Sequence, residues 1–477
     1  MKKNIFNISL TISFLIIIVD GFSNPVDIVS AEKIVLNKLK SSDKSLMFGI
    51  ASISPVAEDG IIYFYLAELS PTGYFIISAD DELPPVIAYS FDNNADLQSP
   101  LTDFFKDDIK TRLQAVKYLP EDIISKRQEM WTQYLFNDLT RDPEFEQWPE
   151  EGTTSTGGWL EFSWNQGAPW NAMCPMDPVT SSRSYTGCPA TAIAMILNFH
   201  KTTNELVFTD TDDYDHNYAG RNFRIDDDWE TINFPSFPAL NLFLATVNEH
   251  WENAEELTDE DMAALSFACG IIAHQVYTSE GSGTFSVSQA YDAYMRLGCS
   301  TALLYTENDE ELFPTLILNM QHALPAHLAI VDEAWSTGHN IVVDGYNTDN
   351  YFHINFGWGG AYNGWYLIPD EMPYSMTVVE GLIVDIFKDN SSEYNVAQSL
   401  SEISIFPNPA ESTLFLNLNG KQAEIIEIFD NTGRLIENKN SFTNQSQINI
   451  QELNSGSYFI RIIFDDRSLF NSGFIKL

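Results

Sequence analysis

Positive charge is scarce in this chain of 477 residues, which has 25 lysines and arginines against 67 aspartates and glutamates. A formal charge of -42 repels nucleic acid and anionic lipid and favours solubility outside the cell, so we expect no nucleic-acid partner. Cysteine is scarce too, and four cysteines are too few for a disulfide scaffold in a chain this long. If one of them is a working thiol, at most one disulfide can form, and the sequence leaves the pair open.

Long apolar runs are also lacking. The chain begins with Lys2 and Lys3, continues with an apolar run from Ile8 to Val19, and then turns to small and polar residues. This pattern predicts a signal peptide over residues 1–23. The alternative, a membrane anchor, needs about 20 apolar residues, which is more than this run has. We therefore expect a secreted or cell-surface protein with no transmembrane segment in its mature form.

Apolar and aromatic residues are plentiful at 44% and 13%, enough for two or three hydrophobic cores. Residues 24–150 mix helical and alternating strand patterns, which predicts a compact α+β module. The stretch of residues 141–158, between this module and the main domain, is polar and predicts an exposed linker that proteases can cut. Residues 151–390 form the main domain, and short strands of period two predict a small β-sandwich over residues 401–477. The fold class is α+β.

Cys188 opens a predicted helix that runs to about Leu197. Gly187 before it allows a tight approach, and Pro189 suits the first helical turn because a proline lacks the N–H that would have no partner there. A thiol at a helix N-terminus feels the positive end of the helix dipole, which favours the nucleophilic thiolate. The alternative is a buried structural cysteine in a helix of small residues.

Two alternating apolar runs around a short polar turn predict a β-hairpin between residues 339 and 358. Pairing Tyr346 with Tyr351 and continuing outward places Asn355 opposite Val342. The same register places residues 339 and 358 side by side. One hairpin can therefore place three groups together: the imidazole of His339, the amide of Asn355 that would orient it, and the indole of Trp358 that would shield both.

His339 begins the first of these runs directly after a glycine, and Trp358 ends the second. A lone histidine is more often structural than catalytic, and we interpret the other seven histidines in that way. Cys188 is followed about 150 residues later by His339 and then by Asn355. This is the chain order of papain-like proteases.

Local motifs add to the evidence from this order of residues. Through these motifs the chain resembles the streptopain family of papain-fold cysteine proteases. The motifs cover residues 164–171, 186–200, 279–283 and 338–366. Residues 73–89 resemble part of the family's propeptide. The C-terminal strands resemble the sorting domain of the type IX secretion route, which delivers bacterial proteins across the outer membrane. The resemblance implies a papain-like domain over residues 151–390, preceded by an α+β propeptide domain.

The resemblance implies Cys188 as the nucleophile, His339 as the general base and Asn355 as the residue that orients the imidazole. Gln166, before the nucleophile, is a candidate oxyanion donor beside the backbone N–H of the cysteine. The expected substrate-binding residues are Ser282, Gly338 and Trp358. We expect no metal or other cofactor.

Some positions depart from the family pattern. Pro189 replaces a more usual valine and Met195 a glutamine, and both are expected to affect packing only. Phe356 stands where the family tends to have tryptophan, which could loosen the cover over the histidine and lower the rate. The acidic clusters at residues 210–215 and 226–228 are interpreted as solvated surface, with weak calcium binding as the alternative.

Both motif groups fit one mechanism, so the expected function is a secreted cysteine endopeptidase made as a zymogen and acting through a thioester. The expected partners are protein or peptide substrates, the chain's own propeptide as inhibitor, and the secretion machinery. Two alternatives use the same fold: a catalytically silent surface binding protein, and a cysteine acyl transferase in which an amine replaces water.

Overall fold

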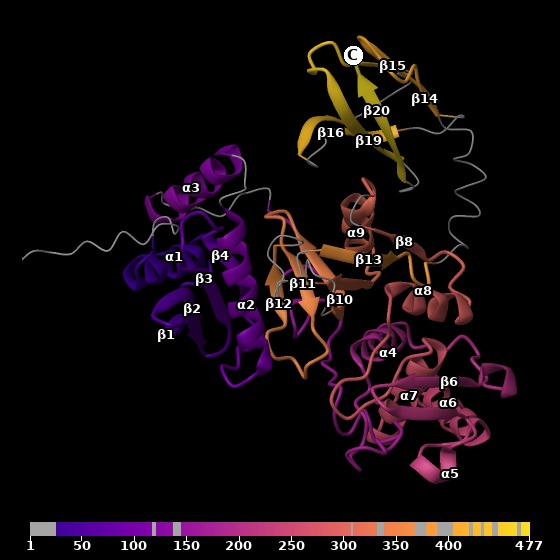
Figure 1. Cartoon of the computed structure of the whole chain (residues 1–477). Coiled ribbons are helices and arrows are strands. Elements are labelled where there is room, and N and C mark those ends of the chain that lie inside the picture. Colours follow the sequence, from indigo (N-terminus) through magenta and orange to yellow (C-terminus); the bar gives the residue numbers. More distant parts are fainter. Residues whose placement is uncertain are drawn as a thin grey trace, which may run out of the picture.

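The computed structural model describes residues 25–116, 121–136, 145–306, 309–331, 338–367, 378–388, 404–418, 423–430, 434–440, 447–464 and 469–477. The predicted signal peptide lies outside these ranges. We refer to residues 25–136 as the N-terminal module, residues 145–388 as the central domain and residues 404–477 as the C-terminal sandwich (Figure 1). No helix of the described part has both the length and the apolar character needed to cross a bilayer.

The N-terminal module packs helices on an antiparallel sheet. Its elements are α1 (Ile28–Ser41), β1 (Gly49–Glu58), β2 (Ile61–Ser70), β3 (Tyr74–Ser78), β4 (Val86–Ser90), α2 (Pro100–Ala115) and α3 (Glu121–Phe136). Helix α1 is capped by Asp27, whose side chain accepts a hydrogen bond from the backbone N–H of Ser30. Its buried residues recur at helical spacing and form one apolar face that packs on the sheet.

The central domain combines a helical part with a strand-rich part. Its helices are α4 (Cys188–His200), α5 (Trp229–Ile232), α6 (Phe237–Glu252), α7 (Asp259–Ile272), α8 (Val287–Arg296) and α9 (Leu312–Gln321). Its strands are β5 (Gln147–Trp148), β6 (Tyr214–Tyr218), β7 (Arg221–Ile225), β8 (Leu303–Tyr305), β9 (Ala326–Val331), β10 (Gly338–Asn347), β11 (Phe352–Asn355), β12 (Gly364–Tyr366) and β13 (Val378–Val384). Helix α4 is apolar on every side and buried from Pro189 to Leu197, because it packs against both α7 and β10. The expected α+β class is confirmed.

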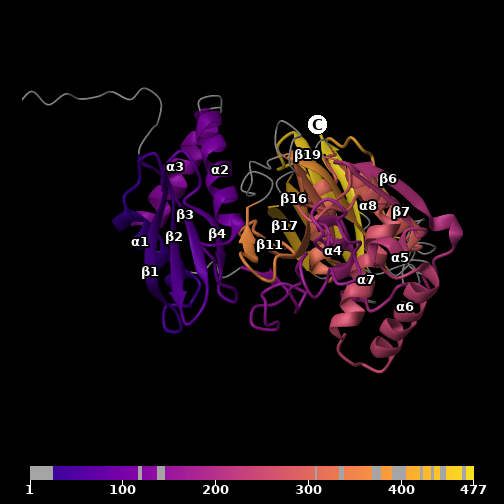
Figure 2. The same cartoon turned by 60° about the horizontal axis from the view of Figure 1, so that its bottom comes forward.

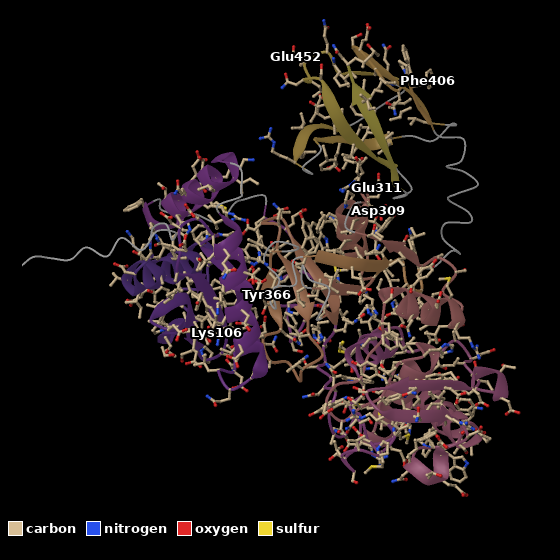
Figure 3. All side chains as sticks on the ribbon, viewed as in Figure 1. Lys106, Asp309, Glu311, Tyr366, Phe406 and Glu452 are labelled. Carbon is tan, nitrogen blue, oxygen red and sulfur yellow. The ribbon has the colours of Figure 1, made fainter. Side chains whose placement is uncertain are left out.

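The sheets of the N-terminal module and the central domain are continuous. The strand order is β1-β2-β3-β4-β12-β11-β10-β9-β13-β8, with β5 paired to β10. Strands β4 and β12 make the join, where Tyr89 pairs with Trp365. Both views show the N-terminal module beside the orange strands of the central domain (Figures 1 and 2). Tyr366 lies at the join (Figure 3), and its hydroxyl is 2.8 Å from the hydroxyl of Tyr74.

The predicted hairpin is formed by β10 and β11. Val342 pairs with Asn355 as predicted, but a bulge nearer the turn shifts the register by one, so that Tyr346 pairs with Phe352. The turn is therefore one residue longer than expected. Asn347 explains the difference, because its side-chain oxygen accepts two backbone N–H bonds within the turn.

The segment predicted as an exposed linker, residues 141–158, is only partly exposed where it is described. Gln147 and Trp148 form β5 and pair with β10. At Gly158 a Cβ atom would collide with the side chains of Asp344 and His353, so this end is packed into the domain. The exposed part of the described linker lies around residues 150–155.

The C-terminal sandwich consists of two antiparallel sheets around one core, as predicted. Its strands are β14 (Ser404–Phe406), β15 (Thr413–Asn417), β16 (Ala423–Asp430), β17 (Leu435–Asn440), β18 (Gln447–Asn449), β19 (Gly456–Phe464) and β20 (Leu469–Lys476). The sheets have the orders β14-β15-β18 and β17-β16-β19-β20. Their buried residues, among them Leu414, Ile426 and Ile460, form a separate hydrophobic core.

Candidate active site

Cys188 is the first residue of α4 and is half-buried. Gly187 before it has a φ of 83°, a conformation that favours glycine. A Cβ atom at Gly187 would lie 2.7 Å from Oε1 of Gln275 and 2.9 Å from the carbonyl oxygen of Ser282. This glycine therefore lets the loop of residues 279–283 approach the candidate nucleophile closely.

Strand β10 crosses α4, and its alternation decides which side chain meets the thiol. Val342 belongs to the core that contains α4, whereas Ile341 belongs to the core on the other face of the sheet. Asn340 shares the face of Val342, and its Nδ2 lies 3.9 Å from Sγ of Cys188. Alternation places the side chain of His339 on the opposite face of the strand, and the amide of Asn340 contacts the thiol.

His339 is buried between aromatic rings on its own face of the sheet. Its ring is parallel to that of Phe356, with centroids 6.4 Å apart, and meets Trp358 edge-on at 6.0 Å. The predicted neighbourhood of His339 and Trp358 is thus present. Nε2 of His339 donates to the carbonyl oxygen of Phe356 at 3.1 Å, a contact that turns this nitrogen toward the chain after β11.

Burial sets the protonation states of the two candidate catalytic groups. It raises the pKa of the Cys188 thiol, an effect opposed by hydrogen bonds from Asn340. It lowers the pKa of His339 to about 4. At neutral pH this form of the protein therefore holds a neutral thiol and a neutral imidazole.

Asn355, the expected orienting residue, has both ends of its amide engaged in this structure. Its Nδ2 donates to the carbonyl oxygen of Phe162 at 3.0 Å, and its Oδ1 accepts from the backbone N–H of Gly357 at 3.1 Å. These bonds fix the chain between β11 and Trp358.

The other predicted site residues lie around the start of α4 or the start of β10. The backbone oxygen of Gln166 accepts from the N–H of Thr186 at 3.0 Å, which holds Gln166 beside the segment that leads to Cys188. Ser282 closes its own loop by bonding to the backbone of Thr278. Gly338 is exposed and begins β10.

Two further features near the site were not found from the sequence. One is Asn340, described above. The other is Asp177, a buried carboxylate whose oxygens each lie 3.0 Å from Nε of Arg221 and which also accepts from the backbone N–H and hydroxyl of Ser279. Asp177 therefore anchors the loop of residues 279–283. No local pattern signals this role, because Asp177 and Ser279 are 102 residues apart.

All four cysteines are free, and only Cys188 is partly exposed. Burial raises the pKa of the other three thiols, that of Cys299 to about 12, so they are poor nucleophiles. Within the described ranges no group of three or more His, Cys, Asp or Glu side chains is arranged to hold a metal ion.

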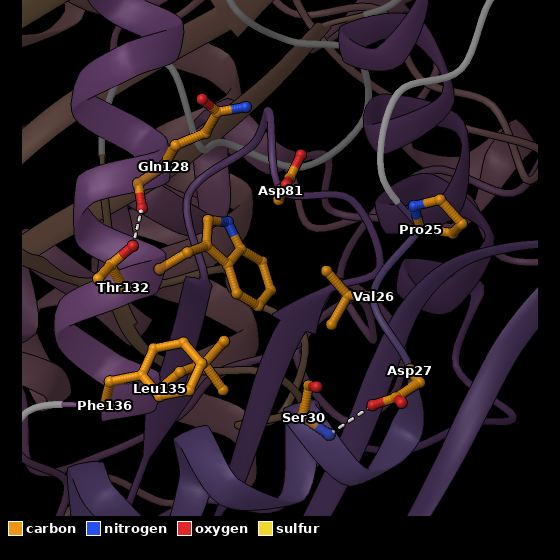
Figure 4. Close-up of a pocket in the computed structure, with 10 residues that line it drawn as sticks. Pro25, Val26, Asp27, Ser30, Asp81, Gln128, Thr132, Leu135 and Phe136 are labelled. Atoms are coloured by element: carbon orange, nitrogen blue, oxygen red, sulfur yellow. Dashed lines mark hydrogen bonds between the residues drawn. The ribbon is translucent and has the colours of Figure 1, made fainter.

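A pocket in the N-terminal module lies between the start of α1 and α3 (Figure 4). Val26, Trp131 and Phe136 line it, and neither Cys188 nor His339 takes part. The chemistry expected from the sequence therefore lies elsewhere, at the crossing of α4 and β10.

A cysteine at a helix N-terminus and a histidine on the strand that packs against this helix are features that cysteine peptidases share. Residues 164–366 match the Peptidase C10 family and therefore form a domain of this family, the streptopain family. Residues 23–112 match the Spi protease inhibitor and residues 404–476 the secretion system C-terminal sorting domain. With this sorting domain the protein is secreted or displayed at the cell surface.

Known relatives share modest sequence identity. The chain is 24% identical to the thiol protease/hemagglutinin PrtT of Porphyromonas gingivalis over 384 residues, which are 76% of this chain and 41% of that protein. It is 23% identical to streptopain of Streptococcus pyogenes over 326 residues, 63% of this chain and 73% of streptopain. A prointerpain A fragment of Prevotella intermedia has 18% identity and a TM-score of 0.46, covering 70% of this chain and 97% of the fragment.

Proposed function

We propose that this protein is a cysteine endopeptidase that is secreted as an inactive precursor. The observation that carries the proposal is Cys188 at the start of α4, in a Peptidase C10 domain whose histidine strand crosses that helix. In the active form the Cys188 thiolate attacks the peptide carbonyl, and His339 protonates the leaving amine. Water then hydrolyses the thioester with His339 as its base. The backbone N–H of Cys188 and the side chain of Gln166 are the proposed oxyanion donors.

The inactive state of the precursor is argued from the position of His339. Its Nε2 is bonded to Phe356, and Asn340 occupies the place beside the thiol. We infer that the start of β10 rearranges on activation, which brings the imidazole of His339 to Sγ of Cys188. In that form Asn355 is proposed to orient the imidazole, and Ser282, Gly338 and Trp358 to line the substrate cleft.

The N-terminal module is the proposed inhibitor. Its strand β4 extends the same sheet that carries β10, so the module and the histidine strand share one hydrogen-bonded framework. A partly buried ion pair joins the two parts as well, with Nζ of Lys38 3.0 Å from Asp349. Lys38 also lies 5.5 Å from the ring of Tyr89 and 5.7 Å from that of Tyr351.

The proposed division of the chain follows these roles. Residues 1–23 are a signal peptide, residues 24–150 the propeptide, residues 151–390 the protease and residues 401–477 the sorting domain. Maturation cuts the linker within residues 141–158, and the exposed residues 150–155 are the proposed place for the cut.

The test compares the intact precursor with protein cut in this linker, using casein turnover as the readout. The cut protein should digest casein, the intact precursor should not, and Cys188→Ala should be inactive in both forms. An irreversible thiol-protease inhibitor should modify Cys188 in the cut protein. Full activity in an uncut precursor would remove the zymogen claim, and labelling of Cys174, Cys269 or Cys299 with Cys188 spared would remove the nucleophile.

The hydrogen bond from His339 to Phe356 occupies Nε2 of the imidazole, and a histidine held in this way also fits a catalytically silent binding protein. A cut protein that retains casein without digesting it would favour that function. An amine acceptor added to the assay separates hydrolysis from acyl transfer, since only a transferase would join the amine to the acyl group.

A further inference from the structure

A chain of hydrogen bonds runs from the thiol of Cys188 into the interior of the central domain. Nδ2 of Asn340 lies 3.9 Å from Sγ, and Oδ1 of the same amide lies 2.7 Å from Nε2 of His327 on β9. Nδ1 of His327 lies 3.1 Å from the hydroxyl of Tyr294 on α8. Both His327 and Tyr294 are fully buried, so the far end of this chain is shielded from solvent.

Each hydrogen bond in this series has a defined donor and a defined acceptor. Burial lowers the pKa of His327 to about 4, so that its ring is neutral at pH 7 and has one donor and one acceptor nitrogen. With Oδ1 of Asn340 turned toward His327, Nε2 must donate and Nδ1 must accept from the hydroxyl of Tyr294. The remaining amide N–H of Asn340 then points at the sulfur of Cys188.

We propose that Asn340 is a hydrogen-bond donor to the Cys188 thiolate, and that His327 and Tyr294 are positioning residues that fix the orientation of its amide. A donor at this place favours the charged form of the nucleophile, because a hydrogen bond to an ion is stronger than one to a neutral group. The role rests on Cys188 being the nucleophile proposed above.

Two features of the surroundings raise the pKa of the thiol, and the hydrogen bond from Asn340 opposes them. Burial and the negative field of Glu380 on β13 both raise the pKa of Cys188. The backbone and side chain of Asn340 on β10 and the backbone N–H of Cys188 on α4 lower it. Glu380 has a fixed place of its own, because its carboxylate accepts from the backbone N–H of Val287 at 2.9 Å.

The test measures the rate of Cys188 alkylation against pH in the full-length precursor, by mass spectrometry of the Cys188 peptide. Asn340→Leu removes the amide at similar volume and should raise the midpoint by about one pH unit, a tenfold change in the thiol–thiolate equilibrium. Asn340→Ala should raise it in the same direction if the leucine variant folds poorly. Asn248→Leu is the matched control: this half-buried asparagine on α6 bonds to Thr203, and its loss should leave the midpoint unchanged.

The positioning role of His327 is tested by comparing its variants with those of Asn340, singly and in combination. His327→Phe should raise the midpoint less than Asn340→Leu does, since the amide is freed but not removed. His327→Gln should restore the wild-type midpoint because glutamine keeps an N–H donor at similar reach. The double variant Asn340→Leu/His327→Phe should match Asn340→Leu alone, as expected for two residues that act through one contact. A purely structural role of His327 would give additive changes instead.

Two results would overturn the proposal. An unchanged midpoint in the folded Asn340 variants would mean that the amide does not act on the sulfur. A lowered midpoint would mean that the amide is reversed and stabilises the neutral thiol. Because alkylation reports the thiol itself, either result is distinct from a failure of the proposed peptidase activity, which only the casein assay measures.

Discussion

Gly187 combines a positive φ of 83° with close packing against Gln275 and Ser282. We expect Gly187→Ala to lower stability by about 1–3 kcal/mol through backbone strain, and to lower turnover at least tenfold by displacing the loop from Cys188. Denaturant unfolding and casein digestion measure the two effects. Gly281→Ala in the same loop is the control, since Gly281 has no positive φ and no atom within 4 Å of an added Cβ. Equal losses in both variants would contradict the packing argument.

The thiol of Cys188 should change its titration when the protein matures. In the precursor, burial raises its pKa above the ordinary value, so alkylation should require alkaline pH. After the linker is cut and His339 reaches the sulfur, the midpoint should fall into the range of about 3.5–7.5 that imidazolium-paired thiols show. His339→Ala should prevent this fall. Superimposable alkylation curves of cut wild type and cut His339→Ala would show that the two residues do not interact.

At the scale of elements, the pairing of β4 with β12 is reinforced by Lys38 of α1 and Asp349 of the hairpin turn. Asp349→Asn removes one charge and leaves Lys38, only 7% exposed, without its counter-ion. Because Asp349 itself is 41% exposed, we expect a loss of about 1–2 kcal/mol rather than the full value of a buried pair.

The measurement for Asp349→Asn is the delay between cutting the linker and the onset of casein turnover, which should shorten as the module leaves sooner. Glu58→Gln is the control, because Glu58 pairs with Lys106 and Lys110 inside the N-terminal module. An equal delay in Asp349→Asn and wild type would show that the ion pair does not retain the module.

For the whole molecule, acid should become destabilising as the pH falls below about 6.5. Burial lowers the pKa of four histidines to about 4: His200, His216, His327 and His339. Their unfolded value is near 6.5, so the unfolded chain binds protons that the folded protein excludes. The stability they contribute is full above pH 6.5 and is lost as the pH falls toward 4. Three aspartates whose pKa is raised by partial desolvation oppose this loss nearer pH 4: Asp92, Asp213 and Asp226.

Urea unfolding at pH 7.5, 6.5, 5.5 and 4.5 checks this expectation. Each of these histidines should contribute a slope of up to about 1.4 kcal/mol per pH unit below pH 6.5, and the half-buried His200 and His216 less than the buried His327 and His339. His200→Phe should reduce the slope, because its ring packs against Phe199 and Phe387 and a phenyl group there has no proton to bind. A slope equal to that of wild type would show that His200 does not contribute.

The C-terminal sandwich has its own hydrophobic core. Deletion of residues 401–477 should therefore leave casein turnover of the cut protein almost unchanged while abolishing export from the producing cell. Activity in cell lysate and in the medium separates the two effects. Normal amounts of the truncated protein in the medium would contradict the sorting role.

Local sequence patterns predicted those features that depend on neighbouring residues. The helix that opens on Cys188 follows from Gly187, Pro189 and the apolar run after them. The pairing of Val342 with Asn355 follows from strand alternation and one turn. The register failed only where Asn347 builds its own turn, because a side chain bonding to the backbone competes with the regular ladder.

Contacts between distant segments were decided by the tertiary structure alone. The face of β10 that meets α4 determines that the amide of Asn340 lies beside Cys188, 152 residues away in the chain. The join of β4 to β12 likewise depends on two edge strands meeting. Period and composition describe which side of an element is apolar. They do not determine which other element packs against that side, because the packing of the whole chain decides that contact.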